Sequence, residues 1–531
     1  MPDQYDIVVI GGGSNSLTAA AYMAKAGRSV LVLEKNDHFG GGSVSMEVAP
    51  GFTHDPHATG FMTCMGNPAL ARDELQLTSR HGLAFVEWGA AFSTLFDDGT
   101  GLITYRDIDR SCQSIAQFSE RDASAYRELA GRCVQLGPLL TKGAATPPLP
   151  LNRFMGLLEE SPMGRELAAS FFNSAYDILC YYFESVEVKM HFMKWVAEAM
   201  ENPETNGTGI LIYNLLALVH CGGAFAPVGG AQRVSDALVK CIQHYGGTLR
   251  TEAEVVRVIV SSGRATGVRL KDGEEIRAGQ AVIGCIHPWN LGKFVPEIDR
   301  ELATQARRVK LSNHGAVNQQ ISLSTEPIFK ANSPDIFREC MVVEYMPRDG
   351  MAAMREALDG FRFGKIPYGH ISPLTIINSF IDKSRVPKAG QCALYLYNFA
   401  PLQLADGGLE GWDARKQEYA DLVWQTFKRF TTNIDDSMIL GRHIETPLDH
   451  HRHSASMLHG DIFGIGTTAG QMLGRRPIPA LANYRVPGIG GLYLAGPFMH
   501  PGGTVTLGGR ATAMVIYQDL DIDLGKGFEG I

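Results

Sequence analysis

The order of apolar and polar positions predicts an α/β unit at the start of the chain. Residues 7–10 form a continuous apolar run, which is typical of a parallel strand buried on both faces. The turn Gly11-Gly12-Gly13 follows, and residues 16–26 fit a helix. A second apolar run covers residues 30–33, and Glu34 comes directly after it. The pattern therefore predicts strand, tight turn, helix and strand, with an acid at the end of the second strand.

The same glycine-punctuated pattern returns later in the chain. Residues 225–300 contain a helix, a hairpin and a buried strand, and residues 480–531 contain a strand, a glycine-rich turn and a helix. Residues 110–220 are mostly helical in pattern and rich in large apolar side chains, whereas residues 310–430 mix strand-like runs with a helix near 412–430.

This alternation predicts an α/β fold with two domains. A Rossmann-type cofactor domain would be assembled from three discontinuous segments, residues 1–100, 225–300 and 480–531. An α+β substrate domain, residues 101–224 and 301–479, would be inserted between them. A length of 531 residues is consistent with two domains.

The first unit has the chemistry of a dinucleotide site. Gly11 permits the tight turn, and Gly13 allows the backbone to approach a pyrophosphate closely. The N-terminus of the following helix directs N–H groups and a positive dipole at the phosphates. Glu34 can accept hydrogen bonds from ribose hydroxyls. Ser16 stands where a third glycine is usual, and it is small enough for close helix–strand packing.

Two further glycine-rich segments favour FAD over a nicotinamide cofactor. The cluster Gly40-Gly41-Gly42 follows the acid, and it can run backbone along a pyrophosphate and ribityl chain. Near the other end, a strand over 491–496 leads into His500-Pro-Gly-Gly503 and then into a helix-compatible stretch. The two ends of the chain therefore look like two halves of one flavin site. The segments Asp55-Pro-His57 and Phe61-Met62 either line the entrance to the flavin or pack in the core.

Composition and charge exclude several other classes of protein. A hydrophobic content of 45%, a charged content of 20% and a net charge of −8 give no indication of a nucleic-acid surface. No apolar run approaches the roughly 20 residues of a spanning helix. A core strand begins within a few residues of the N-terminus, so we expect no signal peptide and a cytoplasmic protein. No Cys-x-x-Cys motif encodes a redox disulfide or a zinc site.

Taken together, these motifs resemble the phytoene-desaturase-like branch of the FAD-dependent amine oxidase superfamily, and within it the group of pyridine nucleotide-disulfide oxidoreductase domain protein 2. The resemblance covers most of the chain and implies a two-domain amine oxidase-like fold with FAD as the cofactor. By position it implies the following cofactor contacts: Gly11, Gly13, Ser14, Asn15, Glu34, Lys35, Gly41, Gly42, Ser43, Ser45, Val255, His287, Gly496, Gly503, Thr504 and Val505. Thr504 stands where the family has a glycine, which places a side chain beside the flavin.

Two histidines and one histidine-rich run need separate consideration. His500 is the candidate catalytic residue, although a packed loop histidine fits the pattern equally well, and a structural role fits His287 better than a chemical one. The run 449–453, with His459 and Asp461, invites a metal interpretation. Adjacent histidines on one regular element do not readily converge on one ion, so no metal site is expected.

The function that these residues and the resemblance imply is dehydrogenation or desaturation. Two hydrogens would leave an apolar, terpenoid or carotenoid-like substrate, with hydride transfer to flavin N5. The electrons would pass to a quinone, another carrier or oxygen. The aromatic- and methionine-rich stretch 171–200 would line the substrate tunnel or form an ordinary helix core. Amine oxidation, isomerisation or saturation on reduced flavin, and a flavin-binding subunit of a hetero-oligomer remain alternatives. Peripheral membrane contact and homo- or hetero-oligomerisation also stay open.

Overall fold

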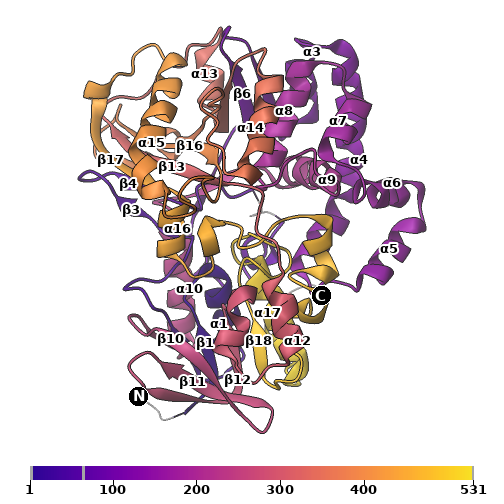
Figure 1. Cartoon of the computed structure of the whole chain (residues 1–531), viewed down its shortest axis with the longest axis vertical. Helices are drawn as coiled ribbons and strands as arrows, with labels where there is room; N and C mark the ends of the chain where they lie inside the picture. The colour runs from indigo at the N-terminus through magenta and orange to yellow at the C-terminus, as the bar shows by residue number, and fades with distance from the viewer. Residues whose placement is uncertain (1–3, 63–65, 529–531) are drawn as a thin grey trace.

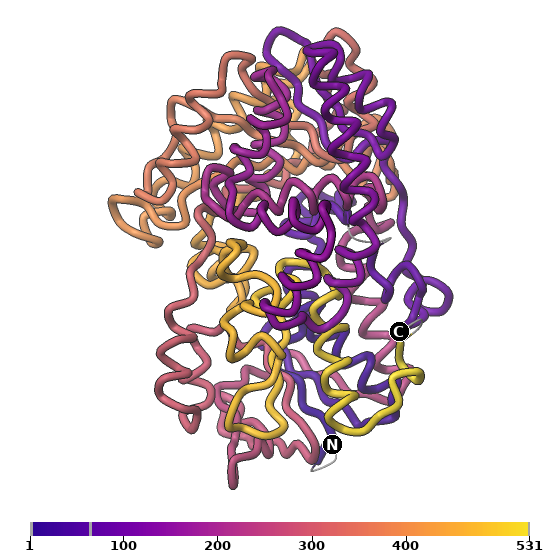
Figure 2. Tube along the Cα trace, turned by 90° about the vertical axis from the view of Figure 1, so that its right-hand side faces the viewer, coloured from indigo at the N-terminus to yellow at the C-terminus, as the bar shows by residue number. Residues whose placement is uncertain are grey.

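The computed structural model describes residues 4–62 and 66–528. The chain forms two halves stacked along the long axis of the molecule, each built around a seven-stranded sheet (Figure 1). Both ends of the chain lie in the lower half, where the first and last segments are neighbours (Figure 2). The fold is the two-sheet α/β arrangement that the resemblance implies.

The lower sheet confirms the predicted N-terminal unit. Strands β1 (Gln4–Ile10) and β2 (Val30–Leu33) pair in parallel, and helix α1 (Ser14–Lys25) connects them. The sheet runs β10–β11–β12–β1–β2–β9, and β18 also pairs with β12. The predicted hairpin is confirmed, since β11 and β12 are consecutive strands that pair in an antiparallel way. The remaining strands are β9 (Thr248–Arg250), β10 (Val255–Ser261), β11 (Arg264–Leu270), β12 (Glu275–Gly284) and β18 (Leu492–Leu494).

Helix α1 packs against two helices that come from distant parts of the chain. Its neighbours are α10 (Gln232–His244) and α17 (Leu507–Asp519). A Cβ atom on Gly509 would overlap the backbone oxygen of Asn15, so α17 approaches α1 as closely as a glycine allows. This contact brings the start and the end of the chain together at one edge of the lower sheet.

The upper sheet is mostly antiparallel and runs β17–β13–β16–β15–β14–β6–β7. The helix that the sequence pattern predicts near 412–430 is present as α15 (Trp412–Arg429), and it packs on one face of this sheet. Every residue of strand β16 (Cys392–Ala400) is buried. Its successive side chains point to opposite faces of the sheet, and both faces are covered. Leu394 and Leu396 contact the α15 core, and Tyr395 and Tyr397 point to the opposite side. The other strands are β6 (Ala90–Phe96), β7 (Gly101–Tyr105), β13 (Gly315–Leu323), β14 (Cys340–Met346), β15 (Leu374–Ile376) and β17 (Ile439–Glu445).

The opposite face of the upper sheet packs on a helical layer, and the predicted helical character of residues 110–220 is confirmed. This layer lies beside β6 and the helix α14 (Met351–Gly360) in the upper right of Figure 1. Its helices are α3 (Ile108–Ala116), α4 (Glu120–Ala145), α5 (Leu151–Glu159), α6 (Pro162–Ser170), α7 (Ala175–Tyr182), α8 (Val186–Ala197) and α9 (Gly209–Ala217).

The exact domain boundaries stay predictions. Strand β6 pairs in the upper sheet, although its residues fall inside the first predicted cofactor segment. Within the described part of the chain, every helix is too short or too polar to cross a bilayer.

The close contact between α1 and α17 predicts a large effect of a single methyl group. We expect Gly509→Ala to lower the free energy of unfolding by about 1–3 kcal/mol, because the new Cβ overlaps the Asn15 carbonyl. Gly131→Ala in α4 is the matched control, since its Cβ would have open space within 4 Å. The control should be neutral or stabilising by up to about 1 kcal/mol. Equal denaturant midpoints for the two variants would refute the contact.

Candidate functional site

A single cavity of about 590 Å³ extends from the lower sheet into the upper half of the molecule. It is lined by the glycine-rich turns of both chain ends and by the inner face of the upper sheet. The predicted cofactor residues that line it are Gly11, Gly13, Ser14, Asn15, Glu34, Lys35, Gly41, Gly42, Ser43, Val255, Gly496, Gly503, Thr504 and Val505. The structure therefore brings these residues to one cavity, whereas Ser45, His287 and His500 lie outside its lining.

The first glycine turn is shaped to receive a phosphate group. Gly11 has a φ of +88°, which only glycine adopts readily. Gly13 is the N-cap of α1, and no side chain caps the helix there. The first N–H groups of α1 thus remain available to a ligand at the cavity wall. A Cβ on Gly41 would lie 3.0 Å from the Cα of Gly13, so the second glycine loop packs directly on the first.

Glu34 is held rigidly at the end of β2. Its carboxylate accepts hydrogen bonds from the N–H groups of Gly12, at 2.6 Å, and Asn36, at 2.9 Å. The side chain is buried and lines the cavity, as does Val255 at the start of β10. A carboxylate has further lone pairs, so Glu34 can also accept from the hydroxyls of a ribose in the cavity.

Asn15 joins the two ends of the chain inside the site. Its Nδ2 donates to the carbonyl of Thr504 at 2.8 Å, and its Oδ1 accepts from the N–H of Gly509 at 3.0 Å. The Oγ1 atom of Thr504 is buried and finds no hydrogen-bond partner among the described residues. A cavity-lining hydroxyl of this kind fits a bound polar group, and these residues together suit the phosphates, ribose and ring of FAD.

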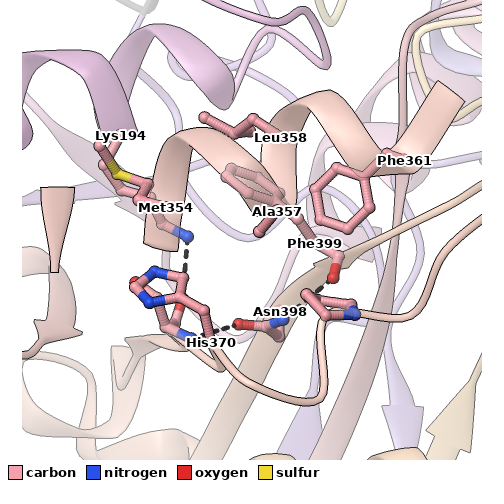
Figure 3. A pocket seen from close by; sticks show the side chains of 10 residues that line it. Lys194, Met354, Ala357, Leu358, Phe361, His370, Asn398 and Phe399 are labelled. Carbon is pink, nitrogen blue, oxygen red and sulfur yellow. Dashed lines mark hydrogen bonds between the residues drawn. The ribbon is translucent and has the colours of Figure 1, made fainter. Parts of the chain in front are cut away.

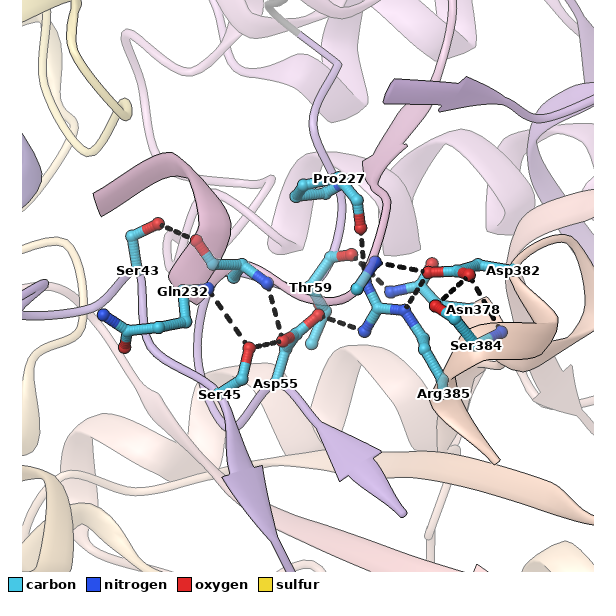
Figure 4. A network of polar contacts seen from close by, with 12 residues as sticks. Ser43, Ser45, Asp55, Thr59, Pro227, Gln232, Asn378, Asp382, Ser384 and Arg385 are labelled. Atoms are coloured by element: carbon cyan, nitrogen blue, oxygen red, sulfur yellow. Dashed lines mark hydrogen bonds and ion pairs between the residues drawn. The ribbon is translucent and has the colours of Figure 1, made fainter. Parts of the chain in front are cut away.

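Ser45 has a different position from the one that the resemblance implies. Its hydroxyl donates to Asp55 at 2.6 Å, within a buried polar network (Figure 4). Asp55 also forms an ion pair with Arg385 at 2.5 Å, and Arg385 contacts Asp382 at 3.2 Å. Since the Asp55 carboxylate also accepts from the N–H of Ala231 at 2.8 Å, Ser45 helps to fix the loop that carries the glycine cluster.

The two candidate histidines are anchored in the protein. His287 bonds the carbonyl of Gly464 at 2.8 Å and accepts from the N–H of Trp289 at 3.2 Å. His500 bonds the carbonyl of Gly143 at 2.9 Å. Burial lowers the pKa of each ring to about 4, so both are neutral at neutral pH. The catalytic assignment of His500 gains no support from its position, because the ring does not line the cavity.

The upper part of the cavity is predominantly apolar. Strands β6, β14, β15 and β16 and helices α8 and α9 supply most of its wall. The apolar and aromatic side chains are Phe61, Met62, Phe92, Trp195, Met200, Leu215, Met341, Val342, Leu374, Ile376, Tyr395, Tyr397, Ile462 and Phe463. Such a wall favours a substrate with a large hydrocarbon surface.

Glu198 is an acid in this apolar wall that sequence reasoning missed. Burial is the main cause that raises its pKa well above the usual range, and the neighbouring Glu344 carboxyl adds to the effect. The nearby cation Lys194 is turned toward a separate cavity of about 20 Å³ (Figure 3). It donates to the carbonyl of Ser372 at 2.8 Å and pairs with Glu344 at 3.4 Å. Burial and the Glu344 carboxyl therefore both favour the protonated form of Glu198.

Sequence patterns also did not assign several other residues to the cavity. Helix α16 (Pro447–His453) and the loop after it contribute His450, Ser454, Ser456 and Met457. Ser454, Ser456 and Met457 belong to no motif that points to a cofactor, and His450 belongs to the histidine-rich run in which no metal site is expected. Only the folded chain brings these four residues to the site. His57 does line the cavity, as one of the two interpretations of Asp55-Pro-His57 expects.

Glu34 provides a direct test of cofactor binding. We expect Glu34→Ala to raise the dissociation constant of FAD about 10- to 100-fold, because hydrogen bonds to a charged group contribute about 1.5–3 kcal/mol. Glu274→Ala is the control, since this exposed acid of the β11–β12 turn lies outside the cavity. Flavin fluorescence titration measures both constants. Identical constants would mean that Glu34 does not contact the cofactor.

Comparison with known proteins identifies the family. Residues 17–340, more than half of the chain, match the family model of flavin containing amine oxidoreductase. Pyridine nucleotide-disulfide oxidoreductase domain-containing protein 2 of Rattus norvegicus is 30% identical, over 97% of this chain and 94% of the relative. A limonene dehydrogenase subunit of Castellaniella defragrans is 26% identical, over 98% of this chain and 96% of the relative.

A solved structure supports the fold. The oxidoreductase from Methanosarcina mazei superposes with a TM-score of 0.61 at 14% identity, over 97% of this chain and 99% of that one. The family match, the relatives and the cavity agree on the cofactor and the class of reaction. The chain belongs to the flavin containing amine oxidoreductase family, and it is an FAD-dependent oxidoreductase of the phytoene-desaturase-like branch.

Proposed function

We propose that this protein is a dehydrogenase or desaturase that removes two hydrogens from an apolar, terpenoid or carotenoid-like molecule. The observation that carries the proposal is the continuity of the cavity, which joins the glycine-lined cofactor end to the apolar upper wall. A relative of 26% identity is named as part of a limonene dehydrogenase, and limonene is a terpene hydrocarbon. A hydrocarbon offers no charge to bind, so its orientation would come from shape and from the exclusion of water.

FAD, when bound, supplies a hydride acceptor at N5. The substrate must also lose a proton, and Glu198 is the group that we assign to accept it, acting in its ionised form. Tyr395 and Tyr397 stack on each other, with ring centroids 5.9 Å apart, in the same wall. Their planar faces would hold an unsaturated chain between the sheet and Trp195 of α8.

The electrons then pass to an acceptor, for which we propose a quinone or oxygen. The name of the limonene relative describes it as one subunit of an enzyme, so a hetero-oligomer is part of this proposal. Contact with a membrane surface and a cytoplasmic location stay predictions.

Anaerobic reduction of the bound flavin tests the substrate class. Monoterpenes and short carotenoid precursors should bleach the oxidised-flavin absorption, and aliphatic or aromatic amines should not. Bleaching by amines alone would contradict the proposal and support C–N oxidation. Turnover of an alkene isomer only after chemical reduction of the flavin would replace dehydrogenation by isomerisation.

The raised pKa of Glu198 gives the reaction a defined pH dependence. Only the ionised carboxylate accepts a proton, so the rate of flavin reduction should rise with pH through the range in which the Glu198 carboxyl ionises, and burial shifts that range well above the usual one for glutamate. We expect Glu198→Gln to lower this rate about 100-fold or more and to remove the pH dependence. Stopped-flow absorption measures both effects.

The control for that experiment lies close by along the chain. Glu201 is also buried, and burial raises its pKa to about 8, but it lies outside the lining of the cavity. Glu201→Gln should therefore keep the wild-type pH profile. If it changed the profile and Glu198→Gln did not, the assignment of the base would be wrong.

A further inference from the structure

Three ligand-type side chains from two segments of the chain meet beside the cavity, and two of them, His57 and His450, line it. They are His57, in the loop after β4 (Thr53–His54), Glu445, at the end of β17, and His450 of α16. Each offers a donor atom, and the three atoms all lie within 4.8 Å of one another. Nδ1 of His57 is 3.7 Å from Oε2 of Glu445, and Nε2 of His450 is 3.8 Å from the same oxygen.

The hydrogen-bonding capacity of this cluster is almost unused. Both ring nitrogens of His57, both of His450 and Oε2 of Glu445 are buried and have no hydrogen-bond partner among the described residues. Unpartnered polar atoms are rare in protein interiors, and five in one cluster point to a bound group. We infer that His57, Glu445 and His450 form a site for a divalent transition-metal ion, of which Zn²⁺ is the simplest example.

The charge around Glu445 supports a cation, because no lysine or arginine among the described residues lies within 4.0 Å of its buried carboxylate. Its ion-pair contacts within 4.0 Å are limited to His57, His443 and His450. The nearest arginine along the strand, Arg442, is directed at Asp421 and Gln319. Water could donate hydrogen bonds to the cluster, but it cannot cancel the charge of a buried carboxylate, whereas a divalent cation can.

The geometry also fits an ion. Two ligands that each bind Zn²⁺ at about 2.0–2.2 Å lie no more than about 4.4 Å apart, so the two Glu445 separations allow a bridging ion. The Thr446 capping box fixes the junction between β17 and α16, which carry Glu445 and His450. The loop of His57 is held by the 2.6 Å bond from Asn318 Nδ2 to the carbonyl of Pro56. The ligands are therefore positioned in advance.

Two histidines and one carboxylate make three protein ligands, which leaves one position of a tetrahedral ion open. His57 and His450 line the cavity, so that position faces the cavity and can take water or an oxygen atom of a ligand. Of the histidine-rich run 449–453, only His450 belongs to this site. His451 stacks on His459, with ring centroids 5.7 Å apart, and Asp461 accepts from Ser312, so these side chains do not join the cluster.

Metal binding by the FAD-loaded protein tests the site without reference to turnover. The protein is stripped with a chelator, its FAD content is checked, and Zn²⁺ is titrated by calorimetry. We expect one tight site per chain. Replacement of a ligand, in His57→Gln, Glu445→Gln or His450→Gln, should weaken binding by on the order of 100-fold or more, because even partners of metal ligands contribute 10- to 100-fold.

The neighbouring His451→Gln on the same helix is the control and should bind Zn²⁺ as the unaltered protein does. Co²⁺ supplies a second readout, since a four-coordinate site gives intense ligand-field absorption that the three ligand variants lose. Equal Zn²⁺ affinity in all variants, or no tight site in FAD-loaded protein, would overturn the proposal. In the latter case the unpartnered atoms of the cluster would bind part of the cofactor or a proton instead of a metal ion.

Discussion

The close packing of α1 against α17 is the constraint on which the cofactor site depends. Gly509 permits this approach, and Asn15 uses both ends of its side-chain amide to join the α1 start to Thr504 and Gly509. Without that contact, the glycine turn after β1 and the loop that carries Gly503 and Thr504 would belong to separate surfaces. A network of one buried arginine and two aspartates fixes the second glycine loop against the same region.

The second half of the molecule completes the site from above. Alternation along β16 sends Leu394 and Leu396 to the α15 core and Tyr395 and Tyr397 to the cavity. One face of a sheet thus provides stability and the other provides an apolar wall. In such a wall a carboxyl group such as Glu198 keeps its proton, because burial penalises the ionised form. The combination suits removal of hydrogen from a molecule that has few polar groups.

Local features of the fold and the meeting of the two glycine-rich chain ends could be predicted from the sequence, whereas most other contacts between distant segments could not. The strand–turn–helix unit and Glu34 lie within one short segment, so periodicity and turn chemistry were sufficient to place them. Ser45, His287 and His500 satisfy the same family pattern, but their side chains bond Asp55, Gly464 and Gly143 instead of facing the cavity. Glu198 reaches the cavity wall, and Glu445 comes close to His57, from segments far from the glycine turns, and nothing in their immediate neighbours marks them. Their positions depend on how the two sheets stack.

A crystal structure of the protein with FAD and a bound monoterpene analogue tests the central claim most directly. The account predicts that the adenosine ribose contacts Glu34, that the isoalloxazine ring lies beside Gly496 and Thr504, and that the analogue occupies the cavity between Trp195 and Tyr397. A flavin ring outside this cavity, or an analogue bound away from the apolar wall, would contradict it.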